Sequence, residues 1–92
     1  MNWLPFRKHL SGVATFRKIG RDEWLYRNSE REMRIYAEML AGGEGVEIDF
    51  SAMRNWLAPH EQEPLVWEQR RRVLQEFCDY LTQRKIRWQL RK

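Results

Sequence analysis

One segment near the end of the chain has both the length and the apolar period of an amphipathic helix. Side chains that are apolar, or that have a long apolar stem, recur in it at spacings of three and four residues, which places them along one side of a helix. They are Val66, Arg70, Val73, Leu74, Phe77 and Leu81. We expect the helix to run from about Val66 to Arg84. Because no other segment of the 92 residues is long and periodic enough to form a comparable helix, this one must cover the apolar side of whatever the remaining residues form.

The residues outside this helix alternate between apolar and polar side chains, which is the period of strands with one buried and one solvated face. We expect strands at 13–19, 24–27, 33–39 and 46–50, and a closing strand at 86–90. Gly42, Gly43 and Gly45 separate the third strand from the fourth and supply the positive φ angles that a hairpin connection needs. The sequence therefore predicts an α+β fold, in which an antiparallel β-meander of about five strands carries one main amphipathic helix on one face.

Chain length and composition predict one domain in a reducing compartment. A chain of 92 residues can build one hydrophobic core, so we expect a single domain over residues 1–92, with residues 1–11 as an N-terminal arm. No apolar run approaches the roughly 18 residues needed to cross a bilayer, and the first ten residues lack the features of a secretory signal. The single cysteine, Cys78, cannot form an internal disulfide. We therefore expect a cytoplasmic protein with no membrane partner.

The sequence contains no arrangement typical of catalysis or of metal binding. His9 and His60 lie far apart, and neither has a second ligand at a helical spacing, so no metal site is expected. Cys78 lies beside Phe77 in the predicted helix, where a small buried hydrophobe is a better interpretation than a nucleophile. Without a nucleophile, a general base or a cofactor motif, the sequence predicts no catalytic residues, no cofactor and no enzyme.

The net charge of +4 is unevenly distributed along the chain. Residues 1–22 carry five basic and one acidic side chains (+4), residues 23–69 carry four and ten (−6), and residues 70–92 carry eight and two (+6). A basic end is typical of a polyanion partner, and an acidic middle is typical of a basic partner. The alternative is that the three parts fold against each other and largely neutralise, and both interpretations remain open.

A nucleic-acid-binding module is one function that the basic end supports. Its phosphate contacts would be Arg70, Arg71, Arg72, Arg84 and Lys85, followed by Arg87, Arg91 and Lys92. Three adjacent residues spread over about 200° of helix surface, however, so the arginine triplet does not form one stripe. We expect Arg71 and Arg72 to face water and Arg70 to border the core with its stem on apolar surface.

The five tryptophans divide into two groups. Trp56, Trp67 and Trp88 flank or follow the predicted helix, so we expect them in the core or at its edge. Trp3 and Trp24 are less constrained by their neighbours, and an exposed one could anchor a protein partner.

The run from Ser51 to Val66 resembles the signature of the Immunity protein 74 family of bacterial polymorphic toxin systems. The residues that carry the resemblance are Ser51 and Trp56 at a corner, Pro59, Glu63 and Pro64 in the loop, and then Arg70, Val73, Leu74 and Leu81 in the helix. The hairpin at 34–50 is also similar, so the resemblance covers about residues 24–90. It departs from the family at Trp67, where we expect a serine-like N-cap, because tryptophan cannot accept the amide hydrogen bonds of the first turn.

The resemblance implies a non-catalytic protein that binds and neutralises a cognate toxin domain. Such a protein needs a rigid, charged surface that is complementary to its partner. Our candidate surface is the solvated face of the central hairpin, with Arg34, Tyr36, Glu38, Glu47 and Asp49. For each of these residues, an ordinary solvated sheet face is the competing interpretation. A third function also remains open, an assembly subunit that forms a homodimer through an edge strand or an exposed tryptophan.

Overall fold

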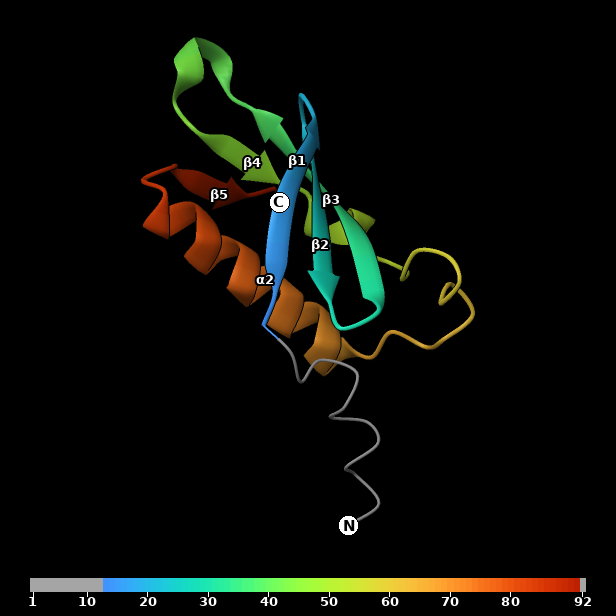
Figure 1. Cartoon of the computed structure of the whole chain (residues 1–92). Helices are drawn as coiled ribbons and strands as arrows, with labels where there is room; N and C mark the ends of the chain where they lie inside the picture. The colour runs from blue at the N-terminus through green and yellow to red at the C-terminus, as the bar shows by residue number, and fades with distance from the viewer. Residues whose placement is uncertain (1–12, 92) are drawn as a thin grey trace.

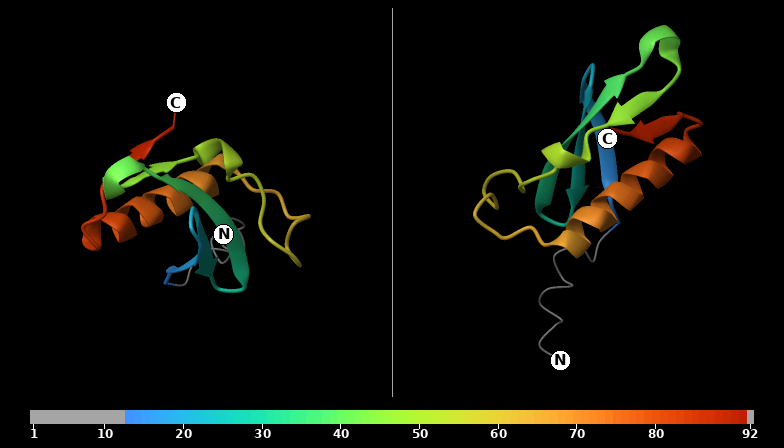
Figure 2. Two further views of the ribbon diagram at one scale, coloured as in Figure 1. Left: turned by 90° about the horizontal axis from the view of Figure 1, so that it is seen from above. Right: turned by 180° about the vertical axis from the view of Figure 1, so that it is seen from behind.

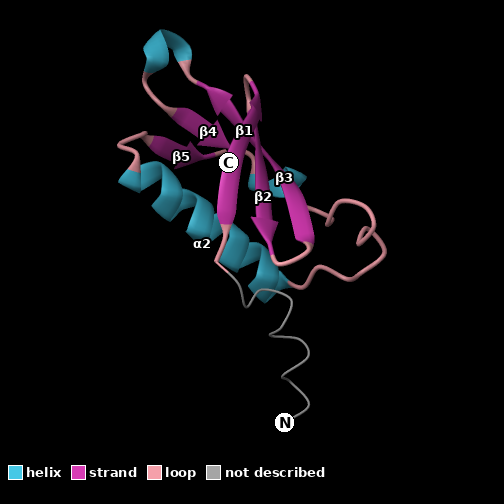
Figure 3. Cartoon of the chain, in the orientation of Figure 1, coloured by secondary structure: helices cyan, strands magenta, loops and turns pink. Residues whose placement is uncertain are grey.

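Residues 13–91 are described by a computed structural model, so the predicted N-terminal arm lies outside the described residues. The strands are β1 (Thr15–Gly20), β2 (Glu23–Asn28), β3 (Arg31–Met39), β4 (Val46–Ile48) and β5 (Trp88–Leu90). The helices are the short 3-10 turns η1 (Ala41–Gly43) and η2 (Phe50–Ala52) and the long helix α2 (Trp67–Gln83). The described strands form one sheet in the order β1-β2-β3-β4-β5, and α2 crosses one side of it (Figure 1 and Figure 3). The predicted α+β fold with one main helix is confirmed.

Strand β3 joins the two parts of the sheet. Its first six residues pair with β2 in antiparallel register, from Asn28 opposite Arg31 to Glu23 opposite Tyr36. Its last three residues pair with β4, from Ala37 opposite Ile48 onward. The views in Figure 2 show the sheet bending along β3, so that its two parts lie over different stretches of α2.

The closing strand corrects one detail of the prediction, because β5 runs parallel to β4 and the sheet is mixed. The loop and α2 that follow β4 carry the chain back along the sheet, so the next strand enters in the same direction as β4. A strand, a helix and a second strand connected in this way form a parallel pair. Alternation in 86–90 predicted a strand but contained no information about its direction.

The core lies between α2 and the face of the sheet that we call the inner face. Val73, Phe77 and Leu81 of α2 are completely buried, and so are Ile35 of β3 and Ile48 of β4. The helical period and the strand period therefore converge on one core, as the sequence predicts. Fully burying such side chains stabilises the fold by roughly 1.5–3 kcal/mol each.

The segment between η2 and α2 covers the part of β3 that β4 does not reach. The Leu57 N–H donates a 2.8 Å hydrogen bond to the Glu32 carbonyl of β3. Met53 and Trp56 are buried beside it, with at most 1% of their surface exposed. Of the other family-motif residues, Ser51 lies in η2, and Pro59 and Pro64 are exposed in the loop.

The structure settles the burial of Trp24, which the sequence left open, and it differs from the prediction at Trp67 and Trp88. Trp24 is 4% exposed, because it lies opposite Ile35 on the inner face and its ring packs against Phe77 with centroids 5.5 Å apart. Trp67 and Trp88 are 54% and 40% exposed, because one begins the helix and the other lies on the outermost strand β5. Trp3 lies outside the described residues.

The N-terminus of α2 is capped differently from the expectation at Trp67. The N-cap is Val66, and Trp67 is the first helical residue. The side-chain oxygen of Gln69 accepts a hydrogen bond from the Val66 N–H at 3.2 Å. A glutamine at the third helical position thus supplies half of a capping box, which explains how the helix begins without a serine.

Candidate functional site

The predicted partner-binding residues lie on the face of the sheet opposite α2, which we call the outer face. Strand side chains alternate, so the burial of Met33, Ile35 and Ala37 turns Arg34, Tyr36 and Glu38 outward. These three are exposed, and Glu47 and Asp49 beside them are partly buried. We use this arrangement as the candidate functional site.

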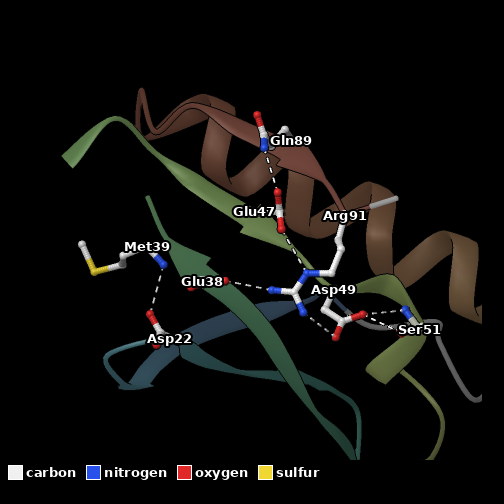
Figure 4. Close-up of polar contacts among 8 residues, drawn as sticks. All are labelled: Asp22, Glu38, Met39, Glu47, Asp49, Ser51, Gln89 and Arg91. Carbon is white, nitrogen blue, oxygen red and sulfur yellow. Dashed lines mark hydrogen bonds and ion pairs between the residues drawn. The ribbon is translucent and has the colours of Figure 1, made fainter. Parts of the chain in front are cut away.

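Arg91, the residue after β5, connects three carboxylates on this face (Figure 4). Its guanidinium lies 3.0 Å from Glu38 Oε1, 3.0 Å from Glu47 Oε2 and 3.3 Å from Asp49 Oδ2. The strand register explains the convergence, since Glu38 lies opposite Glu47 and Glu47 lies opposite Gln89. We call Glu38, Glu47, Asp49 and Arg91 the Arg91 cluster.

The cluster carries a net negative charge in spite of the arginine. Three carboxylates and one guanidinium give −3 + 1 = −2. Like charges directly opposite each other in neighbouring strands are destabilising, and Arg91 offsets this repulsion between Glu38 and Glu47. Asp22 lies beside the cluster, and its Oδ1 accepts the Met39 N–H at 3.0 Å. This region of the outer face is therefore acidic.

Neighbouring hydrogen-bond donors favour the ionised forms of Glu47 and Asp49. Hydrogen bonds from Gln89 and then Arg91 hold the pKa of Glu47 below its ordinary value. The Ser51 hydroxyl, which donates to Asp49 Oδ1 at 2.6 Å, is the largest cause of the lowered pKa of Asp49. The same contacts raise the pKa of Arg91, mainly through Glu47. The folded structure therefore favours the charged forms of Glu47, Asp49 and Arg91.

The other predicted residues, Arg34 and Tyr36, adjoin the cluster. Arg34 forms a 3.2 Å ion pair with Glu23, and a hydrogen bond with Tyr36, followed by the charge of Glu23, raises the Arg34 pKa. Tyr36 is 40% exposed and lines shallow hollows on both sides, one shared with Glu38 and one with Arg54. An exposed aromatic ring thus lies between the acidic cluster and a hollow that Arg34 and Arg54 line.

Sequence reasoning did not assign Arg91 and Gln89 to this site. Their alternation with Trp88 and Leu90 predicts a closing strand, and the sequence suggests Arg91 only as a phosphate contact. What brings them to the carboxylates is the pairing of β5 with β4, which joins residues more than 40 positions apart.

The five basic residues of the nucleic-acid hypothesis do not form one surface. Arg70 turns inward, as predicted, and its Nε and Nη2 donate to the Met53 and Phe50 carbonyls at 2.7 and 3.0 Å. Arg72 lies 3.5 Å from Glu76, and Arg84 stacks on the Tyr80 ring at 4.6 Å. The triplet 70–72 and the pair 84–85 lie at opposite ends of α2, about 20 Å apart at 1.5 Å per residue.

Three further features of residues 13–91 concern metal ligands, the cysteine thiol and the hydrophobicity of the helices. Within residues 13–91, no group of three or more His, Cys, Asp or Glu side chains is arranged to hold a metal ion. Burial, and then the charge of Asp79, raise the pKa of the Cys78 thiol to about 11. No helix in residues 13–91 is long and apolar enough to cross a membrane.

Comparison with known proteins agrees with the resemblance carried by the residues of the 51–66 run. The profile of the family described as Immunity protein 74 matches residues 18–90, which include four complete strands, half of β1 and the whole of α2. No curated protein and no solved structure shows significant similarity to the chain. Since the match covers well over half of the 92 residues, the chain belongs to the Immunity protein 74 family.

Proposed function

We propose that this protein binds a cognate toxin domain and neutralises it, and that the outer face of its sheet is the binding surface. Family membership supports an immunity role. The observation that carries the choice of surface is the Arg91 cluster, in which residues from β3, β4 and the end of β5 hold one another in place.

The cluster is suited to binding because its carboxylates are both ordered and accessible. Their contacts with Arg91 restrict the side chains before a partner arrives, which lowers the entropy lost on binding. The Glu38 side chain nevertheless keeps 60% of its surface exposed, so it can accept further hydrogen bonds. Tyr36 beside it provides an exposed ring of the kind that supplies affinity at interfaces.

The charge of the cluster indicates the kind of toxin surface that it fits. A net charge of −2, with Asp22 adjacent, complements a surface rich in lysine and arginine. A toxin that acts on an anionic substrate would present such a surface around its active site. Covering that surface would exclude the substrate and would not require this chain to catalyse anything.

A charge-reversal experiment tests the proposal. The toxin domain encoded beside this chain is co-expressed with it, and binding of the purified pair is measured by calorimetry. Wild type should restore growth, and Glu38→Lys should weaken binding at least about tenfold, because it places a cation against a cationic surface. The matched control is Glu30→Lys in the exposed turn between β2 and β3, which should change binding less than about twofold.

Two results would contradict the proposal in different ways. A wild-type chain that neither binds the toxin domain nor restores growth would remove the neutralising function. Equal effects of Glu38→Lys and Glu30→Lys on a toxin that does bind would remove the outer face as its binding surface.

A further inference from the structure

Strand β5 is the outermost strand on its side of the sheet. Within residues 13–91 it pairs with β4 alone. Two hydrogen bonds of 2.9 Å show which of its peptide groups are used, one from the Val46 N–H to the Arg87 carbonyl and one from the Arg91 N–H to the Ile48 carbonyl. In a parallel ladder, alternate residues turn both their N–H and their C=O toward the same neighbour. Residues 87, 89 and 91 therefore face β4.

The two residues between them turn their peptide groups the other way. The N–H and C=O groups of Trp88 and Leu90 point away from β4, along the free edge of the sheet. A row of such groups is a template on which another extended segment can pair.

An apolar groove runs beside this edge on the inner face. Trp88 and Leu90 lie opposite the buried Val46 and Ile48 in the register, so their side chains also point toward α2. They are 40% and 43% exposed, because no further strand covers them in the described part of the chain. Together with Leu74 and Cys78 of α2 they line a hollow of about 460 Å³. An added strand could place alternate side chains into this groove.

The charges around the groove favour an acidic occupant. Arg71 and Arg72 of α2 lie at its rim, and the exposed Arg87 precedes β5. Glu68 is the acidic residue at the rim, and Glu76 lies 3.5 Å from Arg72. With both of these acids included, residues 68–92 carry eight basic and three acidic side chains and sum to +5.

We propose that the free edge of β5 accepts an extended, acidic segment of the toxin domain as a sixth strand of the sheet. This inference rests on the proposed function and describes how the partner is held. The peptide groups of Trp88 and Leu90 bind the segment, and its alternate side chains enter the groove beside α2. Its remaining side chains lie on the outer face next to Arg87 and Gln89.

A second copy of this chain fits the edge less well. Twofold antiparallel pairing centred on Gln89 would place Arg87 opposite Arg91 of the other copy, and like charges directly opposite are destabilising. It would also bring together two segments that each carry +6. An acidic segment avoids both the repulsion between opposed arginines and the repulsion between two positively charged segments.

A backbone substitution tests the pairing. Leu90→Pro removes the outward N–H of residue 90 and keeps every hydrogen bond to β4, since proline is tolerated on an edge strand where the N–H faces solvent. Leu90→Ala is the matched control, because it removes the side chain and keeps the N–H. Binding of the toxin domain is measured by calorimetry for both variants, after circular dichroism and thermal unfolding have shown that each is folded.

We expect Leu90→Pro to weaken binding at least about tenfold and Leu90→Ala less than about threefold. Hydrogen exchange provides a second readout on the wild-type chain. The Trp88 and Leu90 amides should exchange rapidly in the free protein and slowly in the complex.

The outcomes separate this inference from the proposed function. If wild type binds the toxin domain but Leu90→Pro has no more effect than Leu90→Ala, and the two amides remain unprotected in the complex, strand addition is wrong and neutralisation stands. If sedimentation shows that wild type is a dimer and that Leu90→Pro dissociates it, a second copy occupies the edge and the proposal is overturned. If wild type does not bind the toxin domain, both proposals fail.

Discussion

Gly45 occupies a position at which a side chain meets the backbone of another strand. Its φ angle is +116°, and a Cβ built on it would lie 2.4 Å from the Arg87 carbonyl oxygen. That carbonyl accepts the hydrogen bond that begins the pairing of β4 with β5. The absence of a side chain at one residue therefore allows the contact that completes the sheet.

Gly45→Ala should destabilise the fold by more than about 2 kcal/mol, because the methyl group must displace the Arg87 backbone in addition to adopting a strained φ. Gly43→Ala is the matched control, with φ +69° and no atom within 4 Å of its Cβ, and it should cost only about 1 kcal/mol. Urea unfolding of both variants gives the two free energies. Equal costs would show that the contact with Arg87 can relax.

Arg70 is the member of the arginine triplet that contributes to the fold. Its guanidinium donates to two carbonyls around η2 and lies 4.5 Å from the centre of the Phe50 ring. It therefore fastens the start of α2 to the segment that follows β4.

Arg70→Lys should lower the free energy of unfolding by about 1–2 kcal/mol, since an ammonium cannot reproduce the two hydrogen bonds and the stacking of a planar guanidinium. Arg71→Lys, at an exposed neighbour, should change it by less than about 0.5 kcal/mol. The comparison is made by urea unfolding at neutral pH. A similar loss in both variants would mean that the contacts of Arg70 contribute nothing specific.

At the scale of elements, one buried hydroxyl joins β2 to α2. Tyr26 is completely buried, and its hydroxyl donates a 2.8 Å hydrogen bond to Glu76 Oε1. Burial and the neighbouring carboxylate both raise the Tyr26 pKa, so the hydroxyl remains protonated over the accessible pH range. The bond orients the helix on the sheet, because apolar packing alone has little directionality.

Tyr26→Phe should destabilise the fold by about 1–2 kcal/mol, because it removes this bond and leaves Glu76 Oε1 without its tyrosine donor. Tyr80→Phe is the control, since the Tyr80 ring makes similar aromatic contacts with Phe16 and Phe77. We expect its cost to be below about 0.5 kcal/mol. Thermal unfolding of the two variants measures the difference, and a larger effect at Tyr80 would refute this account of the helix contact.

At the scale of the whole molecule, ion pairs join residues that are far apart along the chain. Arg91 of the basic end binds three carboxylates of the acidic middle. Within the middle, Arg31 forms a 2.6 Å ion pair with Glu63, and this contact, followed by His60, lowers the Glu63 pKa. The alternative in which the segments neutralise each other thus applies to part of the charge, while the cluster retains an acidic excess.

These contacts determine how stability should depend on pH. The pKa values of Glu47, Asp49 and Glu63 are lowered in the folded state, so the folded protein binds fewer protons than the unfolded chain. Their contribution to stability is complete at neutral pH and is lost as the pH falls below about 5 through the folded values. Urea unfolding at pH 7 and pH 4 should show this loss.

Arg91→Gln should lose less stability than wild type between those two pH values, because it removes a cause of the lowered pKa values of Glu47 and Asp49. Arg87→Gln, an exposed change on the same segment, should retain the wild-type pH dependence. If both variants lose the same unfolding free energy between pH 7 and pH 4, the role of Arg91 in lowering the pKa values of Glu47 and Asp49 is contradicted.

Much of the fold could be predicted from local patterns. Helix α2 begins and ends within one residue of the predicted 66–84, and β2 and β4 lie within two residues of their predicted bounds. The glycines at 42, 43 and 45 all have positive φ. The outward orientation of Arg34, Tyr36 and Glu38 followed from the alternation in β3. Each of these features depends on side chains close in sequence, whose period reports which way they point.

What the tertiary structure decided is which distant segments meet. Sequence period by itself determined the identity of the elements, the faces that they bury and the outward position of the carboxylates. It did not determine that β5 runs parallel to β4, that Trp24 is buried while Trp67 and Trp88 are exposed, or that Arg91 reaches Glu38, Glu47 and Asp49. The physical reason is that strand pairing and ion pairing join residues far apart along the chain, and these contacts depend on how α2 and the loop before it return the chain to the sheet.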